Sequence, residues 1–426
     1  METPPKHWQR GFWSLIATQF QGAFSDCTLK NLVIFIILGM GLPEGQRDKL
    51  VPIVGALFAL PFILFSMTGG YFADHYSKRS VTIGIKVFEI CVMGFATLGL
   101  VLKNLPIELA GVFLMGVHSA LFGPSKYGLL PEILPDNKLS WGNGIIEFGT
   151  FAAIILGTAL GAILSDVFRG RQGYSGGILI ALAVIGLALS FKISHVPAAA
   201  PHKPFRANFL ADLWIQIQLM YKDRPLWLAM LGNTYFSFFG TILQFNIILY
   251  GKDVLRLADT QNGYSQASAA IGIGIGSVAA GYLSRGKIET RLIPLGSIGM
   301  TVLAVLLGIP GLTFWMFDAG LIIVGFFAGF FIVPIGALLQ HRPEKDKKGG
   351  VLAAANLLSF VGVFIASGVY YVMTSIAHLT PGGVFICCGV MTLLGTIYIV
   401  RLLPESFLGV FRKTLTNSPA RDTAQF

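Results

Sequence analysis

The sequence predicts an all-α membrane protein in which twelve transmembrane helices form two six-helix pseudo-repeats. Hydrophobic residues make up 54% of its 426 residues and charged residues only 12%, against roughly 25% charged in soluble domains. Apolar segments of about 20 residues, the length that crosses a bilayer, recur along the chain. The motif that runs from Gly70 to Asp74 returns in the second half from Gly281 to Arg285. These observations exclude a water-soluble fold, and a duplicated membrane bundle is a sequence signature of secondary transporters.

Six apolar segments in the first half are long enough to be transmembrane helices: residues 13–38, 50–72, 81–102, 106–127, 144–164 and 176–193. Six more follow at residues 225–250, 267–283, 292–309, 312–339, 351–373 and 382–403. We therefore expect a first six-helix half over residues 1–196, a cytoplasmic linker over 197–224, a second half over 225–410 and a cytoplasmic tail over 411–426. Within the linker, apolar residues at helical spacing over 209–221 predict an interfacial helix.

The distribution of basic residues predicts the orientation. Most of the 31 Lys and Arg residues lie in the termini and in the loops after even-numbered helices, and basic residues near helix ends stay in the cytoplasm. Both termini are therefore expected there, and the first helix is expected to stay in the membrane because it is too long for a signal peptide. This topology, with anionic membrane lipids as counterions, accounts for the net charge of +10, so nucleic acid is not an expected partner.

Cysteine spacing gives no sign of a metal site. All four cysteines fall within apolar segments, without metal-ligand spacing or a secreted disulfide framework: Cys27, Cys91, Cys387 and Cys388. The sequence therefore implies packing roles for them, and neither a metal nor a cofactor is expected.

The loop between the second and third helices carries a specific motif. Gly70 is followed four residues later by Asp74, and then by the basic residues Lys78 and Arg79. This pattern resembles the signature loop of the major facilitator superfamily. In that family the Asp lies against a helix end of the opposite half, where a carboxylate is favoured, and the basic residues help to hold the cytoplasmic gate shut. The resemblance implies gating roles for these four residues; the alternative is a solvated, positive-inside turn.

Further motifs resemble the bacterial lysophospholipid transporter family over nearly the whole chain, and most closely the transporter portion of members fused to an acyltransferase. They lie at residues 19–26, 122–132, 142–147, 271–276 and 333–356. The resemblance implies movement of lysophospholipid, typically lysophosphatidylethanolamine, across the bacterial inner membrane, so that a cytoplasmic acyltransferase, here a separate partner, can rebuild the diacyl lipid. The chain departs from stand-alone members in the seventh helix, where residues 232–246 lack their Arg, so Glu147 lacks that charge partner.

Ionisable residues inside helices mark a candidate binding site, because a charge at the bilayer centre costs at least ~2.5 kcal/mol. All of them belong to the first half: Asp26, Lys30, Lys86, Glu89, Lys126 and Glu147. We expect Asp26 and Glu147 to bind the ammonium of an ethanolamine headgroup, and Lys30 or Lys126 to bind its phosphate. Asn143, within one of the family motifs, is included in this substrate site.

Two alternatives stay open for these charges. Asp26 with Lys30 is an i, i+4 pair and Lys86 with Glu89 an i, i+3 pair, so each pair could be neutralised along its own helix. Asp26 and Glu147 could instead bind a proton that drives transport, since a desolvated carboxylate can titrate near neutral pH.

The second half offers polar amides and an aromatic run instead of charges. We expect Gln244 and Asn246 on the seventh helix to be buried polar groups of the substrate site. Phe331, the last of the aromatic residues at 326, 327, 330 and 331, is expected to contact the single acyl chain of the substrate.

One pattern suggests an enzyme. His341 and Asp346 have the His-x4-Asp spacing of glycerolipid acyltransferases, but a lone pattern outside its domain carries little weight, so no catalytic residues are expected. Two other functions compete with lysophospholipid transport: a proton-coupled exporter of small amphipathic compounds, and a non-transporting membrane scaffold for an acyltransferase.

Overall fold

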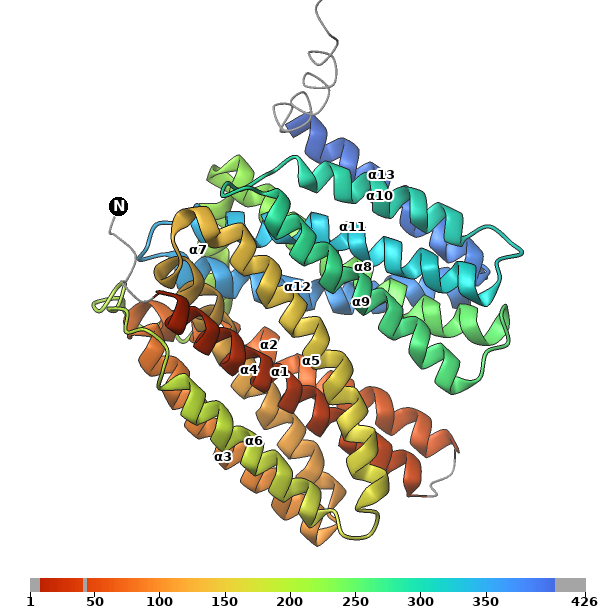
Figure 1. The fold of residues 1–426 in the computed structure, drawn as a ribbon, viewed down its shortest axis with the longest axis horizontal. Coiled ribbons are helices and arrows are strands. Elements are labelled where there is room, and N and C mark those ends of the chain that lie inside the picture. The colour runs from red at the N-terminus through yellow and green to blue at the C-terminus, as the bar shows by residue number, and fades with distance from the viewer. Residues whose placement is uncertain (1–7, 41–43, 403–426) are drawn as a thin grey trace, which may run out of the picture.

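The computed structural model describes residues 8–40 and 44–402, which fold into helices joined by loops, the longest of them over residues 191–208 (Figure 1). The helices of the first half are α1 (Trp8–Gly39), α2 (Glu44–His75), α3 (Lys78–Leu102), α4 (Leu105–Ile133), η1 (Asp136–Lys138), α5 (Leu139–Val167) and α6 (Gly173–Ser190). α7 (Phe209–Lys222) follows, and then α8 (Arg224–Asp253), α9 (Asp259–Leu283), α10 (Leu292–Leu307), α11 (Phe314–His341), α12 (Lys348–Tyr371), the π-helical turn η2 (Val372–Ile376) and α13 (Pro381–Leu402). The expected tail at 411–426, and residues 403–410, lie outside the described residues.

Twelve of these helices are apolar, which confirms the expected fold class. Eleven are long and apolar enough to cross a membrane, and α10 is a shorter apolar helix. α10 ends at Leu307, before Pro310, so it is two residues shorter than the sequence analysis expects. The remaining helix, α7, is the amphipathic helix expected in the linker. Side-chain caps fix several helix starts: Asn104, Asp223 and Thr313 accept hydrogen bonds from the backbone N–H groups of α4, α8 and α11.

Each half has its own apolar core. One cluster of buried side chains joins α1, α3, α4 and α6, and a larger one joins the helices of the second half. Large apolar side chains such as Leu156 and Leu394 are more than half exposed on the outer faces, as expected where lipid replaces water. The division of the chain at residues 197–224 stays a prediction, and α7 lies within that range.

The two halves meet along two helix pairs, α2 with α12 and α5 with α9. At the end of the bundle that carries α7, here called the linker end, the helices approach closely because of glycine. A Cβ on Gly70 of α2 would lie 2.6 Å from the Cβ of Ala353 on α12, and one on Gly144 of α5 would lie 2.4 Å from the carbonyl oxygen of Ser277 on α9. A larger residue at either position would push the halves apart.

Contacts between α2 and α12 continue only part of the way across the bundle. The rings of Phe62 and Phe360 stack with centroids 4.0 Å apart. Nearer the opposite end, Gly55 of α2 and Gly368 of α12 have no atom within 4 Å of where a Cβ would lie. Figure 1 shows the halves diverging away from α7. The described chain is therefore closed at the linker end.

Candidate functional site

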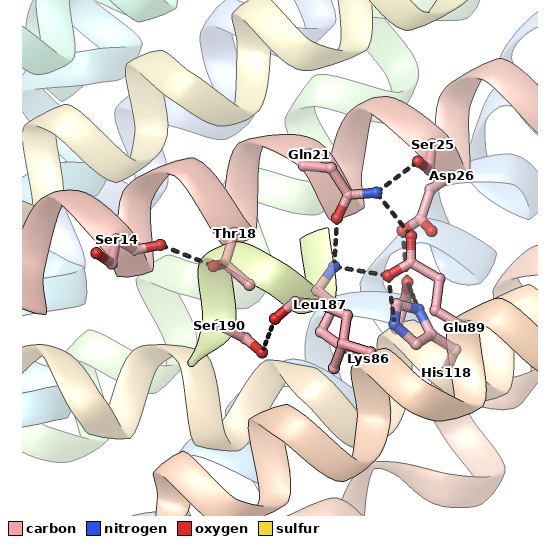
Figure 2. Close-up of polar contacts among 11 residues, drawn as sticks. Ser14, Thr18, Gln21, Ser25, Asp26, Lys86, Glu89, His118, Leu187 and Ser190 are labelled. Carbon is pink, nitrogen blue, oxygen red and sulfur yellow. Dashed lines mark hydrogen bonds and ion pairs between the residues drawn. The ribbon is translucent and has the colours of Figure 1, made fainter. Parts of the chain in front are cut away.

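A buried polar network joins α1 and α3 in the first half (Figure 2). The Lys86 Nζ lies 2.7 Å from Glu89 Oε2 and donates to Gln21 Oε1 at 2.8 Å, while Gln21 Nε2 donates to Glu89 Oε1 at 2.9 Å. Lys86 and Glu89 are fully buried. The expected pairing of Lys86 with Glu89 along α3 is confirmed, and Gln21 adds a hydrogen bond to each of the two charges.

The network continues through α4 to Asp26. His118 Nε2 lies 3.4 Å from Glu89 Oε2, and His118 Nδ1 lies 3.3 Å from Ser119 Oγ. A hydrogen bond joins the Ser119 hydroxyl and Asp26 Oδ2, and Figure 2 shows Asp26, Glu89 and His118 converging between the helices. Asp26 Oδ1 is buried without a hydrogen-bond partner among the described residues. One oxygen of a buried carboxylate is therefore free to receive a donor from a ligand.

Small residues make room for this network. A Cβ on Gly22 of α1 would lie 2.9 Å from Lys86 Nζ, and a Cβ on Gly186 of α6 would lie 1.8 Å from Gln21 Oε1. Both glycines are therefore needed where long polar side chains cross between helices.

A second polar group lies where α4 faces α5. The Tyr127 hydroxyl donates to Glu147 Oε1 at 3.4 Å, and Lys126 Nζ lies 4.5 Å from the centroid of the Tyr127 ring. Lys126 and Glu147 are only partly buried, and Glu147 acts more strongly than Asp26 on the charge of Lys126. Lys126 is therefore the candidate counter-charge for Glu147 that the seventh helix lacks.

The alternative pairing of Asp26 with Lys30 is wrong. Asp26 turns to Ser119 instead, and Lys30 Nζ lies over the ring of Phe58 on α2, 5.5 Å from its centroid. The partners come from other helices because Asp26 faces α4 while Lys30 faces α2. A role for Lys30 in phosphate binding stays a prediction.

Two amides expected in the substrate site form hydrogen bonds within the protein. Asn143 is 2% exposed and forms a reciprocal amide pair with Gln340 of α11, at 3.0 and 2.7 Å, so it ties the two halves together. Asn246 is fully buried and donates to the carbonyl of Pro381 at the start of α13. Neither side chain reaches an accessible surface in this conformation, and a substrate-binding role for Asn143 and Asn246 stays a prediction.

Gln244 and Phe331 are also placed differently from what the sequence suggests. Gln244 is exposed rather than buried. Phe331 is 2% exposed in the core of the second half, where its ring meets that of Tyr235 edge to face at 6.4 Å. In this conformation the ring is held in a packed core, and the acyl-chain contact expected at Phe331 stays a prediction.

The sequence analysis missed Gln21, His118 and Ser119. His118 and Gln21 are polar residues within apolar segments, and intramembrane polar residues are expensive and functional by default. That signal marks His118 as directly as it marks Asp26.

The structure places Asp74 at the predicted kind of position. Its Oδ1 accepts from the N–H of Gly349 at 2.7 Å and its Oδ2 from the N–H of Gly350 at 3.1 Å, both in the first turn of α12. Lys203, from the linker, forms an ion pair with the same carboxylate at 2.7 Å. A buried carboxylate at a helix N-terminus is favoured by charge-assisted hydrogen bonds and by the helix dipole. We call the contacts among these four residues the latch.

The neighbouring residues of the motif act within the first half. Lys78 is buried and pairs with Glu132 at the end of α4 at 2.6 Å, and Arg79 donates to the carbonyl of Phe191 at 2.9 Å. Gly70 provides the close approach of α2 to α12 described above. The gating roles of these residues stay a proposal.

Asp74→Ala should weaken closure of the linker end. Loss of two charge-assisted hydrogen bonds and an ion pair should shift the equilibrium between closed and open forms about tenfold or more. Cysteines can report this at Ser66 and Asn356, whose side chains form a 3.0 Å hydrogen bond between α2 and α12, in a background without the four native cysteines. We expect several-fold slower disulfide formation with Asp74→Ala and no change with the exposed Glu344→Gln. Equal rates in both variants would contradict a latch.

Among the described residues, no group of His, Cys, Asp and Glu is arranged to hold a metal ion. The site is therefore described by its charges and hydrogen bonds alone.

Comparison with known proteins agrees with this architecture. The chain is 28% identical over 387 residues to the lysophospholipid transporter LplT of Klebsiella pneumoniae subsp. pneumoniae, covering 88% of this chain and 92% of that protein. It is 29% identical over 376 residues to the lysophospholipid transporter LplT of Escherichia coli O157:H7, covering 85% and 88%.

Solved structures share the fold at low sequence identity. The human organic anion transporter MFSD10 (TETRAN) aligns with a TM-score of 0.75 and 14% identity, over 93% of this chain and 100% of that chain. FucP, a transporter solved in the outward conformation, aligns with a TM-score of 0.72 and 13% identity, over 91% and 98%. The family model of the Major Facilitator Superfamily matches residues 20–367. The chain therefore belongs to the Major Facilitator Superfamily, and it is a multi-pass membrane transporter rather than an enzyme.

Proposed function

We propose that this protein moves lysophospholipid, and in particular lysophosphatidylethanolamine, across the bacterial inner membrane for re-acylation on the cytoplasmic side. The observation that carries the proposal is the similarity, over 88% of the chain, to a protein named for lysophospholipid transport. The polar groups of the first half support it, because they offer both signs of charge to a zwitterionic headgroup.

The headgroup would bind between Asp26 and Lys126. The free Oδ1 of Asp26 would accept hydrogen bonds from the ethanolamine ammonium, and Lys126 would bind the phosphate. Glu147 acts more strongly than Asp26 on the charge of Lys126, so an arriving phosphate would take the place of Glu147 as the counter-charge of Lys126. Glu147 would hold Lys126 in the empty site.

The described conformation suits loading from the outer side. If both termini lie in the cytoplasm, as the basic residues predict, then the latch closes the cytoplasmic end while the halves diverge toward the periplasm. Opening of the latch would then release the lipid toward the cytoplasmic leaflet. A separate cytoplasmic acyltransferase would consume the product there, since a lysolipid needs one acyl group to become a diacyl lipid.

Uptake into proteoliposomes tests this function. Labelled lysophosphatidylethanolamine should enter vesicles that hold the wild-type protein faster than protein-free vesicles, and faster than labelled diacyl phosphatidylethanolamine. Absence of uptake by folded wild-type protein would contradict the proposal. A change in drug resistance on deletion of the gene would then favour the exporter. A cellular function that survives Asp26→Asn but is lost when the surface loops are changed would favour the scaffold.

A further inference from the structure

We propose that His118, Ser119 and Asp26 form an internal proton relay, which keeps Asp26 neutral while the site is empty and lets it ionise when a cationic headgroup binds. This inference rests on the proposed function and concerns its charge balance. It starts from an unbroken chain of contacts from Glu89 through His118 and Ser119 to Asp26, of which Figure 2 labels Glu89, His118 and Asp26.

Hydrogen-bond counting fixes one end of the chain. Glu89 is ion-paired with Lys86 and accepts from Gln21, and an ionised carboxylate can only accept hydrogen bonds. His118 Nε2 lies 3.4 Å from Glu89 Oε2 and has no hydrogen-bond partner of good geometry among the described residues. An imidazole lone pair that faced the ionised carboxylate would be repelled by it, so we assign a hydrogen to Nε2. The only proton on the imidazole that can vary is the one on Nδ1, which faces the Ser119 hydroxyl.

A hydroxyl both donates and accepts, so two arrangements fit the same geometry. In the first, Asp26 is ionised, Ser119 donates to it, and protonated His118 donates from Nδ1 to Ser119. In the second, Asp26 carries the proton and donates to Ser119, while Ser119 donates to Nδ1 of neutral His118. They interconvert when the Asp26 Oδ2 proton passes to Ser119 Oγ while the Ser119 proton passes to His118 Nδ1. No proton enters or leaves the protein.

Both arrangements have the same net charge. Lys86 and Glu89 neutralise each other, and Asp26 and His118 are either both charged or both neutral. Two further cations face this region, Lys30 on α1 and Lys126 on α4, with Glu147 on α5. The stretches of neighbouring helices that cross the same depth, 50–70 of α2, 176–190 of α6, 319–340 of α11 and 349–369 of α12, contain no Asp, Glu, Lys, Arg or His.

The relay lowers the cost of desolvating Asp26 in the empty site. A buried, ionised carboxylate with an unpartnered oxygen is energetically costly while the binding site is empty. A neutral carboxylic acid avoids that cost but binds an ammonium group poorly. With the relay, the empty site holds the neutral arrangement, and the arriving ammonium at Oδ1 drives the proton to His118. Binding then needs no exchange of protons with bulk water.

The experiment counts protons released on binding. Lysophosphatidylethanolamine is titrated by calorimetry into protein in lipid nanodiscs at neutral pH, in buffers of different ionisation enthalpy. Wild type should release no proton. In His118→Asn the proton of Asp26 has no internal acceptor, so about one proton should appear in the buffer, and affinity should rise up to about tenfold per pH unit. Ser119→Ala interrupts the relay but keeps the His118 contact with Glu89, and it should release about one proton on binding, as His118→Asn does.

Ser125→Ala is the matched control, because it removes a buried hydroxyl from the same helix outside the relay. It should bind without proton release, as wild type does. Release of one proton by wild type, or none by the folded His118→Asn and Ser119→Ala proteins, would overturn the relay.

A second readout needs no substrate. The ¹⁵N chemical shifts of His118, assigned by their loss in His118→Asn, should show a neutral ring protonated on Nε2 in the empty wild type. An imidazolium in the empty protein would overturn the relay even if transport holds. Absence of any lysolipid binding together with a neutral His118 would instead contradict the proposed substrate and leave the relay supported.

Discussion

Asp26→Asn should reduce the initial rate of lysophosphatidylethanolamine uptake by about tenfold to a hundredfold, because a hydrogen bond to a charged group contributes roughly 1.5–3 kcal/mol. The amide keeps the size of the carboxyl group and can still accept from Ser119, but it carries no charge for the ammonium. The measurement is the initial rate of uptake into proteoliposomes, normalised to the amount of protein in the vesicles.

The exposed carboxylate of Asp166, paired with Arg169 on the surface, supplies the control for this substitution. Asp166→Asn should transport at the wild-type rate. Glu147→Gln should also lose uptake, because Lys126 would then lack its counter-charge on α5. Wild-type uptake by a well-folded Asp26→Asn protein would refute the headgroup site while leaving the family assignment intact.

Lys86→Met should destabilise the protein by about 3–5 kcal/mol, the range measured when one partner of a buried ion pair is removed. It would leave Glu89 fully buried with only His118 and Gln21 as partners. The same change at the exposed ion pair, Arg169→Met, should leave stability unchanged, because exposed pairs contribute little. Thermal unfolding in detergent, followed by loss of the monodisperse peak on size-exclusion chromatography, measures both.

The double variant Lys86→Met with Glu89→Gln separates charge from packing. If the cost comes from an uncompensated charge, then the double variant should be more stable than Lys86→Met alone. If both variants unfold at the same temperature, the loss of packing around the Lys86 side chain would explain the effect, and the ionic interpretation would fail.

The latch shows how much of a contact between halves a sequence can predict. The resemblance of the Gly70–Asp74 motif to the signature loop of the superfamily implies an acid at a helix end of the opposite half, and the structure places Asp74 at the first turn of α12. The same motif does not reveal Lys203, which reaches Asp74 from the linker. Nor does it reveal that Lys78 turns to Glu132 within its own half.

The sequence by itself determined the properties that depend on neighbours along the chain. Length and hydropathy are sums over a segment, so they predicted twelve apolar helices, and the i, i+3 spacing predicted the pair of Lys86 with Glu89. Amphipathic spacing was likewise sufficient for α7.

Only the tertiary structure decided which helix faces meet. A membrane helix is apolar toward lipid and toward its own core, so its pattern does not reveal which side is buried. That is why Phe331 proved to be a core residue, why Asn143 pairs with Gln340, and why Asp26 binds Ser119 rather than Lys30. The network from Gln21 to Asp26 exists because three helices bring their few polar side chains to one place, where desolvation makes each one depend on the others.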